Sequence, residues 1–100
     1  MELTGKQKRF LRKLGRDLPT TVAAGKAGLS AAVVAQADRV LSSRELVKVR
    51  VPAGPRPQRE QMGRELAESL AAVCVEVLGR TVLLYRPGNR PDAEERIRLP

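Results

Sequence analysis

A lysine and an alanine stand between two glycines in Gly25-Lys26-Ala27-Gly28, a stretch that separates a predicted strand from a predicted helix. A strand that ends in Gly-x-x-Gly and leads into a helix directs several backbone N–H groups and the positive end of the helix dipole toward one point. Because glycine lacks a Cβ and can adopt positive φ, a phosphate can approach such a loop closely. The motif predicts an anion-binding loop with Lys26 at its tip, although glycine is also common in ordinary turns between a strand and a helix.

This loop does not have the pattern that nucleotide hydrolysis needs, because a P-loop requires Gly-x-x-x-x-Gly-Lys followed by Ser or Thr. A Gly-x-x-Gly loop does clamp the backbone of a few nucleotides in the KH type of RNA-binding module. The sequence therefore favours a KH-like contact with nucleic acid over a nucleotide-binding site.

Positive charge is concentrated near the N-terminus. The 100-residue chain has a formal net charge of +8, and the first sixteen residues alone hold six basic residues against one acidic residue, Glu2. The six are Lys6, Lys8, Arg9, Arg12, Lys13 and Arg16, and a second basic group follows at Lys48, Arg50, Arg56 and Arg59. Clustered positive charge indicates a polyanionic partner, most often a nucleic acid. An anionic membrane surface is the competing interpretation, but the apolar residues of the first helix, with Phe10 as its one aromatic residue, are expected to face the core rather than a membrane.

The residue types exclude several classes of site. The chain has no histidine and a single cysteine, Cys74, so it can form neither an internal disulfide nor a thiolate zinc site. We find no paired carboxylates and no nucleophile with a basic partner, and therefore expect no enzymatic activity, metal, cofactor or small-molecule substrate. Phe10 and Tyr85 are the only aromatic residues, which are too few for reading bases by stacking, and we expect both in the core or at a sheet edge. No apolar run approaches the roughly 20 residues of a membrane helix, and we recognise no signal peptide, so we expect a cytoplasmic protein.

The sequence defines both ends of the first helix. Thr4-Gly5-Lys6-Gln7 fits a capping box, so the helix should begin at about Gly5, and Pro19 stops it. A rotation of about 100° per residue places apolar and cationic residues on opposite faces. The apolar face holds Phe10, Leu11, Leu14 and Leu18; the cationic face holds Lys6, Arg9, Lys13 and Arg16, with Lys8 and Arg12 beside it. Six positive charges without an acidic residue among them forgo the usual ion pairs along a helix, which favours a bound ligand over an ordinary solvated face.

Strands and helices alternate along the rest of the chain. A short strand over 20–24 precedes the glycine loop, Ser30 caps a second helix, and 46–51 is a strand with Lys48 and Arg50 on a solvated face. The prolines of 52–57 predict a loop, and a third helix should extend from about Gln58 to Ala71. Strands over 73–78 and 81–86 then form a hairpin.

This order, α-β-α-β-α-β-β, predicts an α/β domain in which three helices cover a four-stranded mixed sheet. The sheet should be mostly parallel, with an antiparallel member supplied by the last hairpin. We expect one compact domain over residues 1–87 and a polar C-terminal tail over 88–100, in which Arg96-Ile97-Arg98-Leu99 can add a short edge strand.

Four blocks of the sequence together resemble one known family. They are Leu3 to Arg12, Gly25 to Leu29, Glu45 to Val49 and Val77 to Pro87, in this order and at the expected separations. Over most of its length the chain resembles the CRM domain family (chloroplast RNA splicing and ribosome maturation), and within it the stand-alone bacterial proteins of the YhbY type. The combination of four blocks is far more specific than any one of them.

The resemblance implies a fold similar to the C-terminal domain of translation initiation factor three, with a KH-like Gly-x-x-Gly loop that contacts RNA. It also implies association with precursors of the large ribosomal subunit. Carried onto this sequence, the loop contact falls on Gly25, Lys26, Ala27 and Gly28, and the helix contact on Lys6, Lys8, Arg9, Arg12 and Lys13. Lys48 and Arg50 can extend the basic surface.

The sequence thus predicts a non-enzymatic protein that binds structured ribosomal RNA through its phosphates. Two alternatives remain open. One is an adaptor whose basic helix binds an acidic protein partner, and the other is a small DNA-binding protein.

Overall fold

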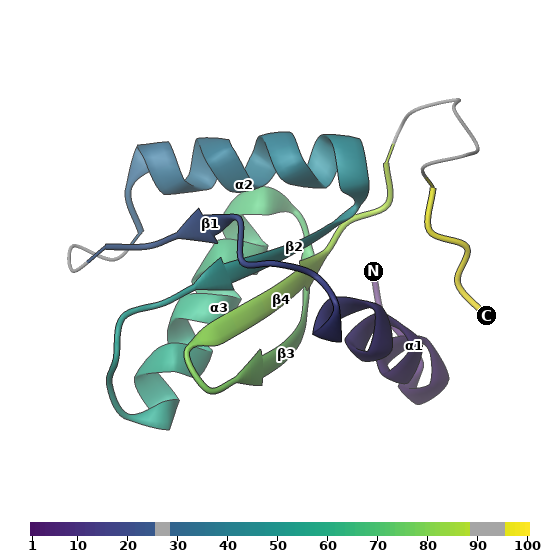
Figure 1. The fold of residues 1–100 in the computed structure, drawn as a ribbon, viewed down its shortest axis with the longest axis horizontal. Helices are drawn as coiled ribbons and strands as arrows, with labels where there is room; N and C mark the ends of the chain where they lie inside the picture. Colours follow the sequence, from purple (N-terminus) through teal and green to yellow (C-terminus); the bar gives the residue numbers. More distant parts are fainter. Residues whose placement is uncertain (26–28, 89–95) are drawn as a thin grey trace.

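The computed structural model of the chain describes residues 1–25, 29–88 and 96–100 (Figure 1). Within them, the predicted order of three helices and four strands is confirmed: α1 (Gly5–Arg16), β1 (Val22–Ala23), α2 (Ala31–Arg44), β2 (Leu46–Arg50), α3 (Arg56–Leu70), β3 (Val73–Leu78) and β4 (Thr81–Tyr85). These elements form one α/β domain whose radius of gyration, 12.7 Å, is that expected for a compact chain of this length.

The strands make one mixed sheet in the order β1-β2-β4-β3. β1 is parallel to β2, with Val22 opposite Val49, whereas β4 is antiparallel to both of its neighbours. As predicted, the last hairpin supplies the one antiparallel strand, β4, but only one of the three neighbouring strand pairs is parallel. β2 and β3 run in the same direction, but the tight hairpin at Gly79 returns β4 between them, so they are not neighbours.

Helices cover both faces of this sheet. α2 and α3 lie on one face, where Val47 of β2 and Leu84 of β4 enter the larger core. α1 lies on the other face, where Leu11 packs with Leu46 and Leu83 in a second, smaller core. Successive residues of a strand point to opposite faces, so each central strand contributes to both cores.

β3 departs from the strict alternation that its sequence predicts. The pairing register with β4 shifts between Cys74 and Glu76, so Val75 is an extra residue in a β-bulge. As a result Val75 joins the core beneath α1, whereas Val77 packs against the core on the α2 and α3 side. The bulge therefore divides the three valines of β3 between the two faces.

The third helix begins two residues earlier than predicted. Pro55 is the N-cap of α3, and Pro57 lies in its first turn. Proline is accepted there because the first backbone N–H groups of a helix have no partner within it. The predicted loop over 52–57 therefore ends at Pro55.

Residues 96–100 form no strand, so the edge strand predicted for this part of the chain is wrong. Ile97 and Leu99 instead pack against the core beneath α1. Gln7 Nε2 of α1 donates a hydrogen bond to the carbonyl oxygen of Pro100 at 3.3 Å, and the C-terminus lies beside α1 (Figure 1).

Candidate nucleic-acid interface

α1 begins where its capping box predicts. The Gln7 backbone N–H donates to Thr4 Oγ1 at 3.1 Å, and the Thr4 backbone N–H donates to Gln7 Oε1 at 3.0 Å. Both bonds satisfy N–H groups that a helix start leaves unpaired. The predicted start at Gly5 is confirmed.

Leu11 and Gly15 fix α1 on the sheet, and both are buried. A Cβ at Gly15 would lie 2.6 Å from Leu83 Cδ2, so the helix backbone comes closer to the sheet than a larger residue would allow. The helix packs through its smallest residue, and its contact face passes through positions 11 and 15. For this reason Leu14, predicted in the core, is 39% exposed.

This packing directs the cationic side chains of α1 into solvent. Lys6, Arg9, Lys13 and Arg16 are exposed, as the helical period predicts, while Lys8 and Arg12 are half-buried. We call these six residues the α1 surface. Ion pairs among the described residues involve Arg56 and Arg86 but none of these six. No ion pair among the described residues therefore engages the α1 surface.

Lys48 and Arg50 lie on the same sheet face as α1. Their cross-strand partners in β4 are Leu83 and Thr81. Arg50 is exposed, but Lys48 is half-buried, so this face is less solvated than predicted because α1 covers part of it. Arg16 and Lys48 border the same small depression, which Glu76 also lines. The depression joins β2 to the end of the α1 surface.

Arg50 also adjoins the start of the glycine loop. The Ala24 N–H donates to the Arg50 carbonyl oxygen at 2.8 Å, where the chain leaves β1. Gly25 follows; it is exposed, a Cβ there would have no neighbour within 4 Å, and its φ is not positive. Neither packing against the described residues nor backbone conformation therefore requires glycine at position 25. The other three residues of the predicted loop contact, Lys26, Ala27 and Gly28, lie outside the described residues.

The chain is described again from Leu29, and Ser30 caps α2 as predicted, its Oγ accepting from the Val33 N–H at 3.2 Å. The end of β1 and the start of α2 lie at the left of Figure 1, whereas α1 lies at the lower right. The described flanks of the loop and α1 thus lie toward opposite ends of the long axis, which measures 37 Å.

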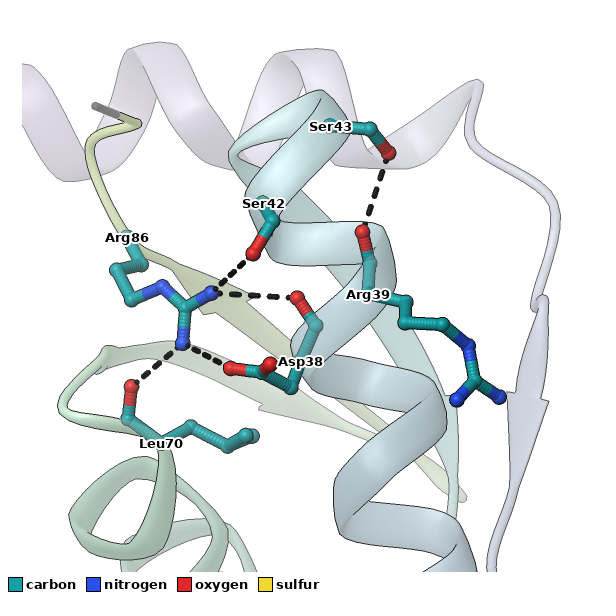
Figure 2. Close-up of polar contacts among 6 residues, drawn as sticks. All are labelled: Asp38, Arg39, Ser42, Ser43, Leu70 and Arg86. Carbon is teal, nitrogen blue, oxygen red and sulfur yellow. Dashed lines mark hydrogen bonds and ion pairs between the residues drawn. The ribbon is translucent and has the colours of Figure 1, made fainter. Parts of the chain in front are cut away.

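Several arginines are engaged by the fold instead. Arg86 follows β4 and donates to Asp38 Oδ1 at 2.7 Å, to Ser42 Oγ at 2.9 Å and to the Leu70 carbonyl oxygen at 2.9 Å (Figure 2). It thereby ties α2 to the end of α3. In the predicted second basic group, Arg59 donates to the carbonyl oxygens of Gly54 and Gly79, and Arg56 pairs with Glu60 at 2.9 Å. Arg56 and Arg59 therefore form contacts within the domain, whereas Lys48 and Arg50 lie on the sheet face that α1 covers.

The aromatic and sulfur side chains are poorly placed for contact with a ligand. Tyr85 is buried, and its burial, followed by the nearby Glu45 carboxylate, raises the pKa of its hydroxyl. Phe10 is half-buried against the core beneath α1. Burial also raises the pKa of the Cys74 thiol, which disfavours the reactive thiolate. Within the described ranges no three metal-ligating side chains gather.

No helix within the described residues is both long enough and apolar enough to cross a membrane.

The site residues predicted from the sequence do not include Glu45, Arg96 or Arg98, which the structure brings together. Glu45 ends α2 and is buried, and its carboxylate accepts hydrogen bonds from the backbone N–H groups of Gly88 and Ile97. This contact holds residues 96–100 against the domain, with Arg96 and Arg98 exposed. The alternation of arginine with apolar residues was the available signal, but it predicted a strand.

Comparison with known proteins gives a consistent result. The family model described as the CRS1 / YhbY (CRM) domain matches residues 3–86. An RNA-binding protein from Haemophilus influenzae is 33% identical over 98 residues, covering 98% of this chain and 95% of the relative. The probable RNA-binding protein YqeI from Bacillus subtilis is 32% identical over 98 residues, covering 98% of this chain and 99% of the relative. The solution structure of a hypothetical protein from Staphylococcus aureus matches with a TM-score of 0.85 and 32% identity, covering 99% of this chain and 100% of that one.

Proposed function

Because the chain belongs to the CRS1 / YhbY (CRM) domain family, we propose that it is a non-enzymatic RNA-binding protein. The relatives named as RNA-binding proteins support RNA as the partner. The names of these relatives do not say which surface contacts the RNA, and the charges and exposure of this chain's own residues support that part of the proposal.

The α1 surface is the observation that carries the proposal. A helix that is held on the sheet by Leu11 and Gly15 presents four exposed cations that form no ion pair with a described residue. Each phosphate that such a cation neutralises releases condensed counterions, which gives affinity without base recognition. With both aromatic side chains packed against the protein, stacking contributes little, so affinity is mainly electrostatic and specificity depends mainly on RNA shape.

We assign a second contact to the loop of residues 25–28 and an intermediate one to Lys48 and Arg50. Gly25 supports the loop contact, because its lack of a side chain serves no packing purpose within the described chain and leaves the backbone open to a phosphate. Arg50 lies between the loop and Lys48, so the cations of β2 can follow an RNA backbone from the loop toward α1.

We further propose that the RNA is structured ribosomal RNA in precursors of the large subunit. The resemblance of the four sequence blocks to the CRM family supports this target. The loop flanks and α1 lie toward opposite ends of the protein, whose longest extent is 37 Å, so an RNA that contacts both must extend across much of the molecule.

The salt dependence of binding tests the phosphate contacts. Wild type is compared with Arg9→Ala/Lys13→Ala and with the control Arg39→Ala, which removes a charge from an exposed position of α2, on the sheet face opposite α1. The probe is a structured fragment of large-subunit ribosomal RNA. We expect the slope of log affinity against log salt to become shallower by about two in the α1 variant and to stay unchanged in the control.

Equal slopes for wild type and the α1 variant would contradict the proposal.

Two further measurements distinguish RNA binding from the alternative functions. Nuclease treatment of a native pull-down should abolish association if RNA mediates it, whereas a protein adaptor would keep its partner. Competition by duplex DNA that matches competition by ribosomal RNA would indicate a DNA-binding protein instead.

A further inference from the structure

The C-terminal segment 96–100 is held at both ends. Near its start, the Ile97 N–H donates to Glu45 Oε1 at 2.5 Å, and at its end Gln7 Nε2 donates to the Pro100 carbonyl oxygen at 3.3 Å. Between these bonds Ile97 and Leu99 pack against the core beneath α1. Five extended residues span at most about 17 Å, so the segment runs from the end of α2 to the first turn of α1.

Glu45 is fixed in a way that suits it to hold this segment. Its backbone N–H donates to the Leu41 carbonyl oxygen at 2.9 Å, and its carbonyl oxygen accepts from the Arg86 N–H at 3.0 Å. Its φ of 66° is uncommon for a residue with a side chain. The residue is only 4% exposed, and its carboxylate accepts from the N–H groups of Gly88 and Ile97. Because a buried carboxylate is costly without such donors, release of Ile97 is disfavoured.

The arginines of this segment face away from the core. Arg96 and Arg98 are exposed and alternate with the half-buried Ile97 and Leu99. Neither arginine forms an ion pair with another described residue. Since Pro100 is bound by Gln7 and Ile97 lines a depression with Leu14, the segment that carries both charges runs alongside α1. Three acidic residues, Asp92, Glu94 and Glu95, precede it in the sequence, outside the described residues.

We propose that residues 96–100 are a second RNA-contacting element, in which Arg96 and Arg98 bind phosphates of the RNA that the α1 surface binds. Glu45 is the positioning residue, because it fixes the start of the segment without touching RNA. This inference rests on the proposed function, and it adds two cations that the family match over 3–86 does not include.

The first test uses the full chain and the same ribosomal RNA fragment. It measures the slope of log affinity against log salt concentration, called the salt slope below. Arg96→Ala/Arg98→Ala should make the slope shallower by about two, while the control Arg39→Ala leaves it unchanged. If the acidic residues at 92, 94 and 95 cancel the two arginines, the slope will not change, and the inference is wrong. An unchanged slope together with an effect of Arg9→Ala/Lys13→Ala would overturn the inference alone. Unchanged slopes in both variants would overturn the proposed function as well.

The second test uses Glu45→Gly, which removes the carboxylate but suits the positive φ at this helix end, so the fold is expected to persist. Amide hydrogen exchange at Ile97 should accelerate, because its acceptor is lost. In this background the effect of Arg96→Ala/Arg98→Ala on the salt slope should fall well below two. If the full effect persists although Ile97 has lost its protection, Glu45 does not position the arginines.

Discussion

Gly15 of α1 lies so close to Leu83 of β4 that a Cβ at position 15 would be 2.6 Å from Leu83 Cδ2. Leu83 is 4% exposed and packs in the core beneath α1, so moving it aside disturbs that packing. We therefore expect Gly15→Ala to lower the free energy of unfolding by about 1–3 kcal/mol, measured by urea denaturation. This loss should occur even though alanine is the better helix former by about 1 kcal/mol.

Gly5→Ala is the matched control for this effect. A Cβ at Gly5 has no neighbour within 4 Å, so this variant should be as stable as wild type or more stable. If Gly15→Ala were as stable as wild type, α1 would not be held on the sheet by the close contact at Gly15.

Gly25 allows a test of the loop that is separate from stability. Because a side chain there meets no described atom and the φ is not positive, Gly25→Val should unfold at the same urea concentration as wild type. If the loop contacts a phosphate backbone, the added side chain should weaken RNA binding by about tenfold, which corresponds to 1.4 kcal/mol. Ala23→Val adds bulk at an exposed position of β1 and should leave the affinity unchanged. Equal affinities of the two variants would remove the loop from the proposed interface.

Arg86 should matter for folding and not for binding. Its guanidinium joins Asp38, Ser42 and the Leu70 carbonyl oxygen, so Arg86→Ala leaves several polar groups without their donor (Figure 2). We expect a loss of about 1–3 kcal/mol in unfolding free energy and an unchanged salt slope for RNA. Asp38→Asn should cost less, below about 1 kcal/mol, because the Asp38 side chain is 55% exposed and its ion pair is screened by solvent. A shallower salt slope for Arg86→Ala would show that Arg86 contacts RNA.

Tyr85 links stability to alkaline pH. Burial raises the pKa of its hydroxyl above the ordinary value of 10.0. A raised folded-state pKa contributes stability that is fully present below pH 10 and is lost as pH rises through the folded value. Wild type should therefore lose stability above about pH 10, and Tyr85→Phe should lose less, as measured by denaturation at each pH.

The sequence simplifies this measurement, because Tyr85 is the only tyrosine and the chain has no tryptophan. Phenolate absorbance therefore follows a single group. Both proteins should carry Cys74→Ala, since burial raises the pKa of that thiol as well. Parallel stability curves for the two proteins would contradict a raised pKa at Tyr85.

Several features could be predicted because their causes lie within a few residues of sequence. The capping box at Thr4, the cap at Ser30 and the hairpin at Gly79 each depend on residues at most four positions apart, so the order of elements followed from them. The exposure of Lys6, Arg9, Lys13 and Arg16 followed from the helical period. The likeness to initiation factor three, the loop contact and the ribosomal target stay predictions.

Tertiary structure decided the rest, because those features depend on how elements that are distant in sequence pack together. Only the packing of α1 on β4 buries Gly15 and exposes Leu14, and only the pairing of β3 with β4 makes Val75 a bulge. The bond between Glu45 and Ile97 joins residues 52 positions apart, so no local pattern could indicate that the C-terminal segment lies beside α1. Local sequence determines which residues can be cationic and exposed, but the packing of the helices on the sheet determines which of those charges lie on the same surface.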